Sequence, residues 1–140
     1  PTVRGFFAYE VPGWTPDGGL SCAVGTQIDW DKPVGMALSL CEPSSWELER
    51  ADTLPELPAG TRKLTHLYTL DHTHGTGLGQ ALYDSVIYPG ENSYLWVLAE
   101  NERAVSFYER LGYKNEGVYF QARGIWAPGR SVRYARILNP

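Results

Sequence analysis

A glycine-rich segment near the middle of the chain is the first place where residue types and spacing could do chemistry. Residues 71–80 read Asp71-His72-Thr73-His74-Gly75-Thr76-Gly77-Leu78-Gly79-Gln80. Glycine lets the backbone turn tightly and lets an anion approach the amides. A helix that begins there adds free N–H groups and a positive dipole end. The segment is therefore typical of a pyrophosphate-binding loop, and a tight turn that binds nothing is the alternative.

Two common nucleotide-binding patterns do not fit this segment. A P-loop would need Gly-Lys-Ser/Thr, which does not follow the glycines. The third glycine of a dinucleotide-binding pattern would stand at position 80 or 82, where the chain has Gln80 and Leu82. If this segment binds a phosphate group, it must belong to another kind of phosphate-binding motif.

Two blocks of residues supply that context, because together they resemble the GCN5-related N-acetyltransferase (GNAT) family. Leu67-Tyr68-Thr69 followed by His74-x-x-Gly77-x-Gly79 is similar to the family's acetyl-CoA loop, Gln/Arg-x-x-Gly-x-Gly/Ala after a Leu-x-Val strand. The second block is similar to the family's Asn-x-x-Ala-x-x-Phe-Tyr-x-x-x-Gly-Phe/Tyr segment, and its matching residues are Asn101, Ala104, Phe107, Tyr108, Gly112 and Tyr113. The resemblance covers 62–113 well and extends weakly over 20–140.

The resemblance implies a fold, a cofactor and a reaction. The fold would be α+β: a twisted, mostly antiparallel sheet with one central parallel strand pair splayed at the acetyl-CoA site, and helices on both faces. The reaction would move an acetyl group from acetyl-CoA to a primary amine of a small molecule or peptide by direct attack. The residues implied to hold acetyl-CoA are Leu67, Tyr68, Thr69, His74, Gly75, Thr76, Gly77, Leu78, Gly79, Gln80, Asn101, Arg103, Ala104 and Tyr108.

Direct transfer needs a donor for the oxyanion and an acid for the leaving thiolate. The resemblance places the donor at a backbone N–H of the splayed strand, near Thr69. Tyr108 is the expected acid, because it lies two helical turns after Asn101 and a phenol can protonate a thiolate of comparable basicity. Tyr108 could instead be a core aromatic, and Asn101 could be a helix cap, a pantetheine ligand or both.

The general base is the least defined part of the expected site. Positions where family members carry a carboxylate are occupied by Lys63 and Trp96. His66 is the expected side-chain substitute, since imidazole titrates near neutral pH, and Glu100 is a second candidate. A structural role for His66, with proton loss through water, is the alternative. His66, His72, His74 and Asp71 are ligand types, but no metal site is expected.

The elements that must position these residues can be read from hydrophobic spacing. Residues 64–69 predict a strand with one β-bulge, residues 78–86 a helix ended by Pro89-Gly90, 94–99 a buried strand, and 104–111 a helix ended by Gly112. Strands are also predicted at 20–27 and 34–40, paired as a hairpin, and at about 117–126 and 131–138. Residues 1–19 read as irregular. The 41–61 segment reads as a long loop in which Ser44 and Glu47 form a capping box.

Composition limits the possible functions. The chain has 140 residues, 43% hydrophobic and 20% charged, which is expected for one globular domain spanning 1–140. A net charge of −4 argues against nucleic-acid binding, and no apolar run reaches the ~20 residues of a membrane span. The two cysteines, Cys22 and Cys41, are too few for a disulfide scaffold, so a reduced, cytoplasmic protein is expected. A homodimer is left open.

Charge divides the chain into two unequal halves. Residues 1–60 hold nine acidic and three basic side chains, whereas residues 61–140 hold seven acidic and nine basic ones. A solubility pattern is one explanation. The other is that the second half holds anionic CoA while the acids of the 41–61 segment attract a cationic acceptor. Trp14, Trp30, Trp46 and Trp126 are expected in the core, or in part in an acceptor pocket.

Two departures from the family leave alternatives open. Its members usually begin with a strand and two helices before the hairpin, and only about twenty residues precede the hairpin here. The chain is therefore expected to be truncated, trimmed, or a variant that builds the acceptor site differently. A non-catalytic acyl-CoA-binding module is the rival function, and transfer of a longer acyl group is a third.

Overall fold

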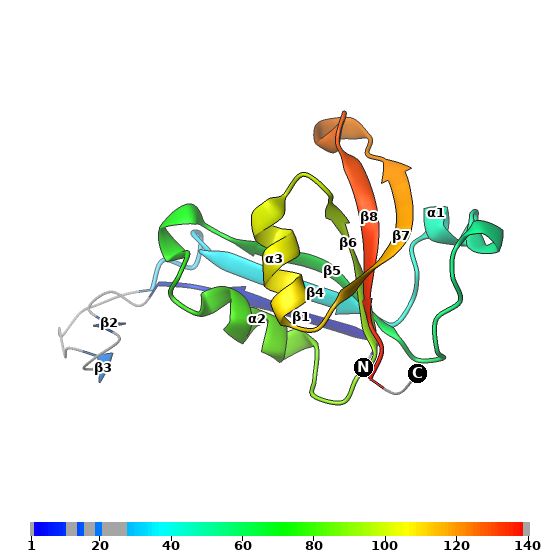
Figure 1. The fold of residues 1–140 in the computed structure, drawn as a ribbon. Coiled ribbons are helices and arrows are strands. Elements are labelled where there is room, and N and C mark those ends of the chain that lie inside the picture. The colour runs from blue at the N-terminus through cyan, green and yellow to red at the C-terminus, as the bar shows by residue number, and fades with distance from the viewer. Residues whose placement is uncertain (1, 11–13, 16–18, 21–27, 139–140) are drawn as a thin grey trace.

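The computed structural model describes residues 2–10, 14–15, 19–20 and 28–138 (Figure 1). Its main element is a six-stranded sheet whose spatial order is β1-β4-β5-β6-β8-β7. These strands are β1 (Val3–Ala8), β4 (Gly35–Leu40), β5 (Arg62–Thr69), β6 (Ser93–Leu98), β7 (Lys114–Gln121) and β8 (Arg130–Arg136). The β5–β6 pair is parallel and the other four pairs of this sheet are antiparallel. This agrees with the mixed sheet implied by the resemblance.

Helices α1 (Ser45–Leu48), α2 (Leu78–Val86) and α3 (Glu102–Arg110) cover both faces of the sheet. Lys63 and Leu64 are neighbours in β5 and therefore point to opposite faces. Leu64 belongs to the core cluster with Leu82 of α2 and Tyr108 of α3. Lys63 forms an ion pair with Glu47 of α1. One face thus carries α2 and α3, and the other carries α1.

The two central strands separate where the expected site begins. β5 and β6 pair over Arg62–Leu64 and Ser93–Leu95 and not beyond, and Figure 1 shows them diverging from that point, with α3 in front of the opening. The bulge predicted in β5 is present, because Leu38 pairs with His66 while the next residue, Ser39, pairs with Leu64. The bulge leaves Leu67 on the α2 side, packed against the core.

The predicted pairing of 20–27 with 34–40 in a hairpin was wrong, because the second of these strands has a different partner. β4 pairs with Val3–Ala8, from a stretch predicted to be irregular. Gly19–Leu20 (β3) instead pairs with Trp14–Thr15 (β2), and 21–27 lie outside the described residues. At the other end, β7 begins at Lys114, three residues before its predicted start, and ends at Gln121. Short 3-10 turns occupy Ala51–Thr53, Asp71–Thr73 and Gly124–Trp126.

Candidate functional site

A cavity of about 830 Å³ lies beside the splayed end of β5, between the glycine-rich loop with the N-terminal end of α2 and one side of α3. We call it the splay cavity. Every residue that the sequence resemblance assigned to acetyl-CoA lines it, except Thr76. Five further residues line it that the sequence did not indicate: Asp71, Thr73, Phe107, Arg110 and Leu111.

The glycine-rich loop presents backbone N–H groups to this cavity. Gly75 and Gly77 have φ values of 79° and 86°, a conformation that side chains other than glycine rarely adopt. The first intrahelical bond of α2 runs from the Ala81 N–H to the Gly77 carbonyl, 3.0 Å away. The amides that precede it at the helix start, those of Gly79 and Gln80, are therefore available to an anion.

The free edge of β5 also presents amides to the cavity. The Leu70 N–H donates to the Val34 carbonyl on the β4 side, at 2.9 Å. Since N–H groups alternate along a strand, those of Thr69 and Leu67 point the other way, into the gap left by β6. These amides could stabilise negative charge that develops on a carbonyl oxygen.

Tyr108 approaches the same gap from α3. Its ring is 9% exposed and packs edge-on against Phe107 and Tyr113, with centroid distances of 5.4 and 5.8 Å. Burial, together with the neighbouring Tyr68 and Tyr83 phenols, raises the pKa of the Tyr108 hydroxyl. The phenol therefore remains protonated at neutral pH and can donate a proton. Tyr108 is both a core residue and a cavity residue, so the two readings of it are compatible.

The start of α3 combines a helix cap with a cationic side chain. The Asn101 side chain accepts a bond of 3.1 Å from the Ala104 N–H, so the N-cap role is observed. Arg103, in the first turn of α3, lines the splay cavity and contacts Nδ1 of His74 across the loop. The guanidinium can only donate in that contact, so the His74 nitrogen accepts. A cation is thereby held beside the loop amides.

Comparison with known proteins agrees with this geometry. The sequence model of one protein family, the acetyltransferase (GNAT) domain, matches residues 54–128, which is more than half of the chain. This chain belongs to the GNAT acetyltransferase family. A search of curated proteins found no match to this chain.

Solved GNAT-like structures share the fold at low identity. Arabidopsis thaliana NAA60 in complex with acetyl-CoA is 15% identical, with a TM-score of 0.62 over all of this chain and 78% of that one. Arabidopsis thaliana Naa50, in complex with the bisubstrate analogue CoA-Ac-MVNAL, is 20% identical, with a TM-score of 0.55 over 77% of this chain and 68% of that one.

A third structure is that of PH1933 from Pyrococcus horikoshii OT3. It is 21% identical, with a TM-score of 0.52 over 84% of this chain. This chain spans 63% of the length of PH1933. At these identities the likeness concerns the fold alone.

His66 lies outside the splay cavity. It pairs with Leu38, on the α1 face, and its ring lies 5.6 Å from that of Tyr68. The Nδ1 atom is buried and has no hydrogen-bond partner within the described part of the chain. Glu100, the second base candidate, is exposed and forms an ion pair with Arg130 at 3.6 Å. Of the two candidates for the general base, His66 is therefore the one on the α1 face of the sheet, opposite the splay cavity.

A buried carboxylate, that of Glu47, lies between Lys63 and Trp96, the two positions where GNAT carboxylates were expected. Glu47 is 3% exposed and contacts both Lys63 Nζ, at 2.5 Å, and Trp96 Nε1, at 2.7 Å. It also accepts the Ser44 N–H at 2.6 Å, as the predicted capping box requires. The capping pattern was visible in the sequence, but the contacts with β5 and β6 had no local signal.

The remaining sequence expectations concern metals and membranes. Within the described ranges, no group of three or more His, Cys, Asp or Glu side chains could hold a metal ion. Helices in those ranges are too short or too polar to cross a bilayer.

Glu47 was expected among the acids of the 41–61 segment that attract a cationic acceptor. It is instead buried and paired with Lys63.

Proposed function

We propose that the chain transfers an acetyl group from acetyl-CoA to a primary amine of a small molecule or peptide. The observation that carries this proposal is the convergence of three groups on one cavity. These are the loop amides beside Arg103, the outward N–H groups of Thr69 and Leu67, and the Tyr108 phenol. The NAA60 and Naa50 structures contain acetyl-CoA and a CoA-based analogue, which supports the same donor here.

The donor would lie along the cavity. Its pyrophosphate would accept hydrogen bonds from the amides at the start of α2, where the helix dipole also favours negative charge. Arg103 would add a positive charge nearby. The thioester carbonyl would lie against the Thr69 N–H, which has no strand partner on that side.

Each proton and bond in the transfer can be assigned to a group. The amine nitrogen bonds to the thioester carbonyl carbon, and the oxyanion that forms accepts the Thr69 N–H. The C–S bond then breaks, and the thiolate takes the proton of Tyr108, which solvent later restores. General acid assistance of this kind contributes about 10²–10⁴-fold.

The acceptor would reach the carbonyl from the α1 face. CoA would occupy the α2–α3 side, so the gap between β5 and β6 would be open to the amine from the other side. His66 lies on that face and would take the proton that the amine nitrogen loses, directly or through water. An imidazole ring nitrogen can accept a proton, and histidine is the side chain most often used as a general base.

A non-catalytic acyl-CoA-binding module is the second candidate. Lys63 and Trp96 stand where GNAT relatives would carry a carboxylate, and the nearby Glu47 is neutralised by Lys63. A protein with this site could bind the donor and lack an efficient base.

Free-thiol release separates the two candidates. Purified protein is mixed with acetyl-CoA and a panel of primary amines and peptides, and calorimetry measures acetyl-CoA binding in parallel. Amine-dependent thiol release supports the enzyme. Tight acetyl-CoA binding with no amine-dependent release supports the binding module. If acetyl-CoA does not bind, both are wrong. Repeating the assay with longer acyl-CoA chains defines the acyl group.

A further inference from the structure

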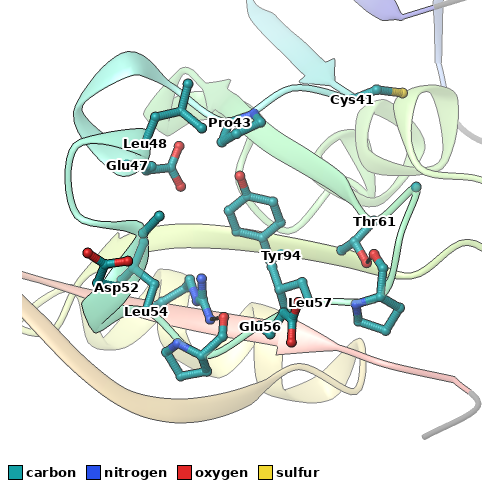
Figure 2. A pocket seen from close by; sticks show the side chains of 15 residues that line it. Cys41, Pro43, Glu47, Leu48, Asp52, Leu54, Glu56, Leu57, Thr61 and Tyr94 are labelled. Atoms are coloured by element: carbon teal, nitrogen blue, oxygen red, sulfur yellow. Dashed lines mark hydrogen bonds between the residues drawn. The ribbon is translucent and has the colours of Figure 1, made fainter.

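A second cavity, of about 560 Å³, lies on the α1 face of the sheet (Figure 2). We call it the α1-face cavity. The segment from Cys41 to Thr61 surrounds it, and Tyr94 of β6 and Arg133 of β8 form its floor. None of the groups assigned above to the acetyl transfer lines this cavity.

The walls of the α1-face cavity are largely apolar. Leu48 is 62% exposed, and Leu54 and Leu57 are half-buried around the same space. Apolar side chains that face a concave, water-filled space favour an apolar ligand group. The body of a ligand at this site would therefore be alkyl or aryl.

The floor of the cavity is polar and buried. Tyr94 is 5% exposed, and its hydroxyl points toward Glu47 in Figure 2. The floor charges are already paired: Glu47 with Lys63, and Arg133 with Glu116 and, at 2.6 Å, with the Pro55 carbonyl. The floor itself is therefore close to neutral.

The rim carries the net charge of the cavity. Asp52 and Glu56 line it, both are exposed, and neither forms an ion pair with another described residue. Because the floor charges are balanced, these two carboxylates leave the cavity negative. A ligand with a cationic end is electrostatically complementary to it.

An aromatic surface connects this cavity with the gap between β5 and β6. Glu47, a cavity residue, accepts the indole N–H of Trp96. The Trp96 ring packs against Trp46 and Phe120, with centroid distances of 5.1 and 4.9 Å. Aromatic faces are good surfaces for methylene groups and for cations.

We propose that the α1-face cavity holds the far, cationic end of the amine acceptor. The acceptor is then an elongated molecule with an alkyl or aryl body and an ammonium group at each end, of which one is acetylated. This inference rests on the proposed acetyl transfer, because it assigns the remote part of that reaction's acceptor.

The strand geometry gives the length of such an acceptor. Lys63 pairs with Tyr94, level with the cavity, and the thioester carbonyl would lie against the Thr69 N–H. Five residues of strand separate these two levels once the bulge is allowed for, or about 16–17 Å at the usual rise. The spanning diamine is the one whose extended length matches that distance.

A length series of α,ω-diamines, each compared with the monoamine of equal length, tests the proposal. We expect kcat/KM to be greatest near the spanning length and there to exceed the monoamine value roughly tenfold, as a charged hydrogen-bonding group would give. The double variant Asp52→Asn/Glu56→Gln should lose this advantage. Glu49→Gln, exposed on the same segment and outside the cavity lining, should keep it.

Failure of the inference is distinguishable from failure of the proposed function. Thiol release with monoamines and diamines alike, independent of length or of Asp52 and Glu56, overturns the cavity assignment and leaves the acetyl transfer standing. If no amine releases thiol, the proposed function fails. Calorimetry then tests whether the α1-face cavity binds the diamine. Binding of the spanning diamine to the wild type and not to the double variant supports the cavity assignment. Binding to both proteins, or to neither, overturns it.

Discussion

The carboxylate of Glu47 on α1 accepts a hydrogen bond of 2.7 Å from the indole N–H of Trp96 on β6. Trp96 is the first residue of β6 beyond the parallel pairing, which ends at Leu95. The same carboxylate pairs with Lys63 on β5, inside the pairing. Glu47 therefore joins the two strands at the point where they separate, and it fixes the 41–61 segment to that point.

Replacing Glu47 with glutamine should destabilise the protein by about 3–5 kcal/mol at neutral pH, because Lys63 would be left buried and unpaired. Burial alone would raise the pKa of Glu47, but bonds from Lys63, Trp96 and the Ser44 N–H outweigh burial and lower it. A lowered folded-state pKa stabilises the fold above the unfolded value, about 4.3, and this contribution is lost as pH falls through the folded value.

The stability difference between wild type and Glu47→Gln should therefore shrink in acid. Chemical denaturation between pH 7 and pH 3 measures it. Glu49→Gln, a neighbouring exposed carboxylate, should match the wild type within about 0.5 kcal/mol. A Glu47→Gln difference that is constant across this range would show that the Lys63 pair does not carry the effect.

Local signals explain why residues 62–113 could be predicted from the sequence. The turn before α2 needs the positive φ of Gly77, and α3 begins at the Asn101 cap and ends before Gly112, with φ 91°. Such signals act within a few residues of the chain. The strand, helix, strand and helix of the splay cavity were therefore correctly predicted, and so was the bulge in β5.

The N-terminal strand could not be predicted because its partner lies far along the chain. The burial pattern of Val3–Ala8 does not alternate, and Phe6 and Phe7 are both substantially exposed. Its pairing with β4 is set by tertiary contacts, including the ion pair of Arg4 with Glu91 at 2.6 Å. The burial of Glu47 could not be predicted for the same reason, since its contact with Trp96 spans 49 residues.

Replacing Gly79 with alanine should have opposite effects on stability and on donor binding. Its added Cβ would meet only Phe107, at 3.8 Å, which is ordinary contact. Alanine is favoured over glycine in a helix by about 0.5–1 kcal/mol, so the melting temperature of the ligand-free protein should rise.

The same methyl group would stand where the pyrophosphate approaches the amides, so acetyl-CoA affinity should fall by at least roughly tenfold, the equivalent of one lost charged hydrogen bond. Calorimetry measures the affinity. Ser85→Ala, at the other end of α2 and outside the splay cavity, should leave acetyl-CoA binding unchanged. Unaltered affinity in Gly79→Ala would remove this loop from the donor site.

Replacing Tyr108 with phenylalanine should lower kcat by about 10²–10⁴-fold, the usual contribution of a general acid. The ring and its packing remain, so acetyl-CoA affinity should change little. Because burial and the nearby phenols raise the pKa of Tyr108, the wild-type rate should show no alkaline fall from this group below about pH 10.

Tyr113→Phe provides the matched control. Tyr113 packs against Tyr108, and its hydroxyl bonds to Ser93 at 2.6 Å and Tyr83 at 3.0 Å, away from the splay cavity. Its loss should cost about 1–3 kcal/mol of stability and leave kcat near the wild-type value. Equal kcat losses in the two variants would mean that Tyr108 acts through packing and not as the acid.

Replacing His66 with glutamine should remove the base and keep a polar side chain on the α1 face. We expect kcat/KM at neutral pH to fall about 10²-fold or more, with acetyl-CoA affinity unchanged, because His66 does not line the splay cavity. His72→Gln, an exposed histidine that contacts Glu10, should match the wild type throughout. A His66→Gln rate equal to the wild-type rate would assign proton removal to water.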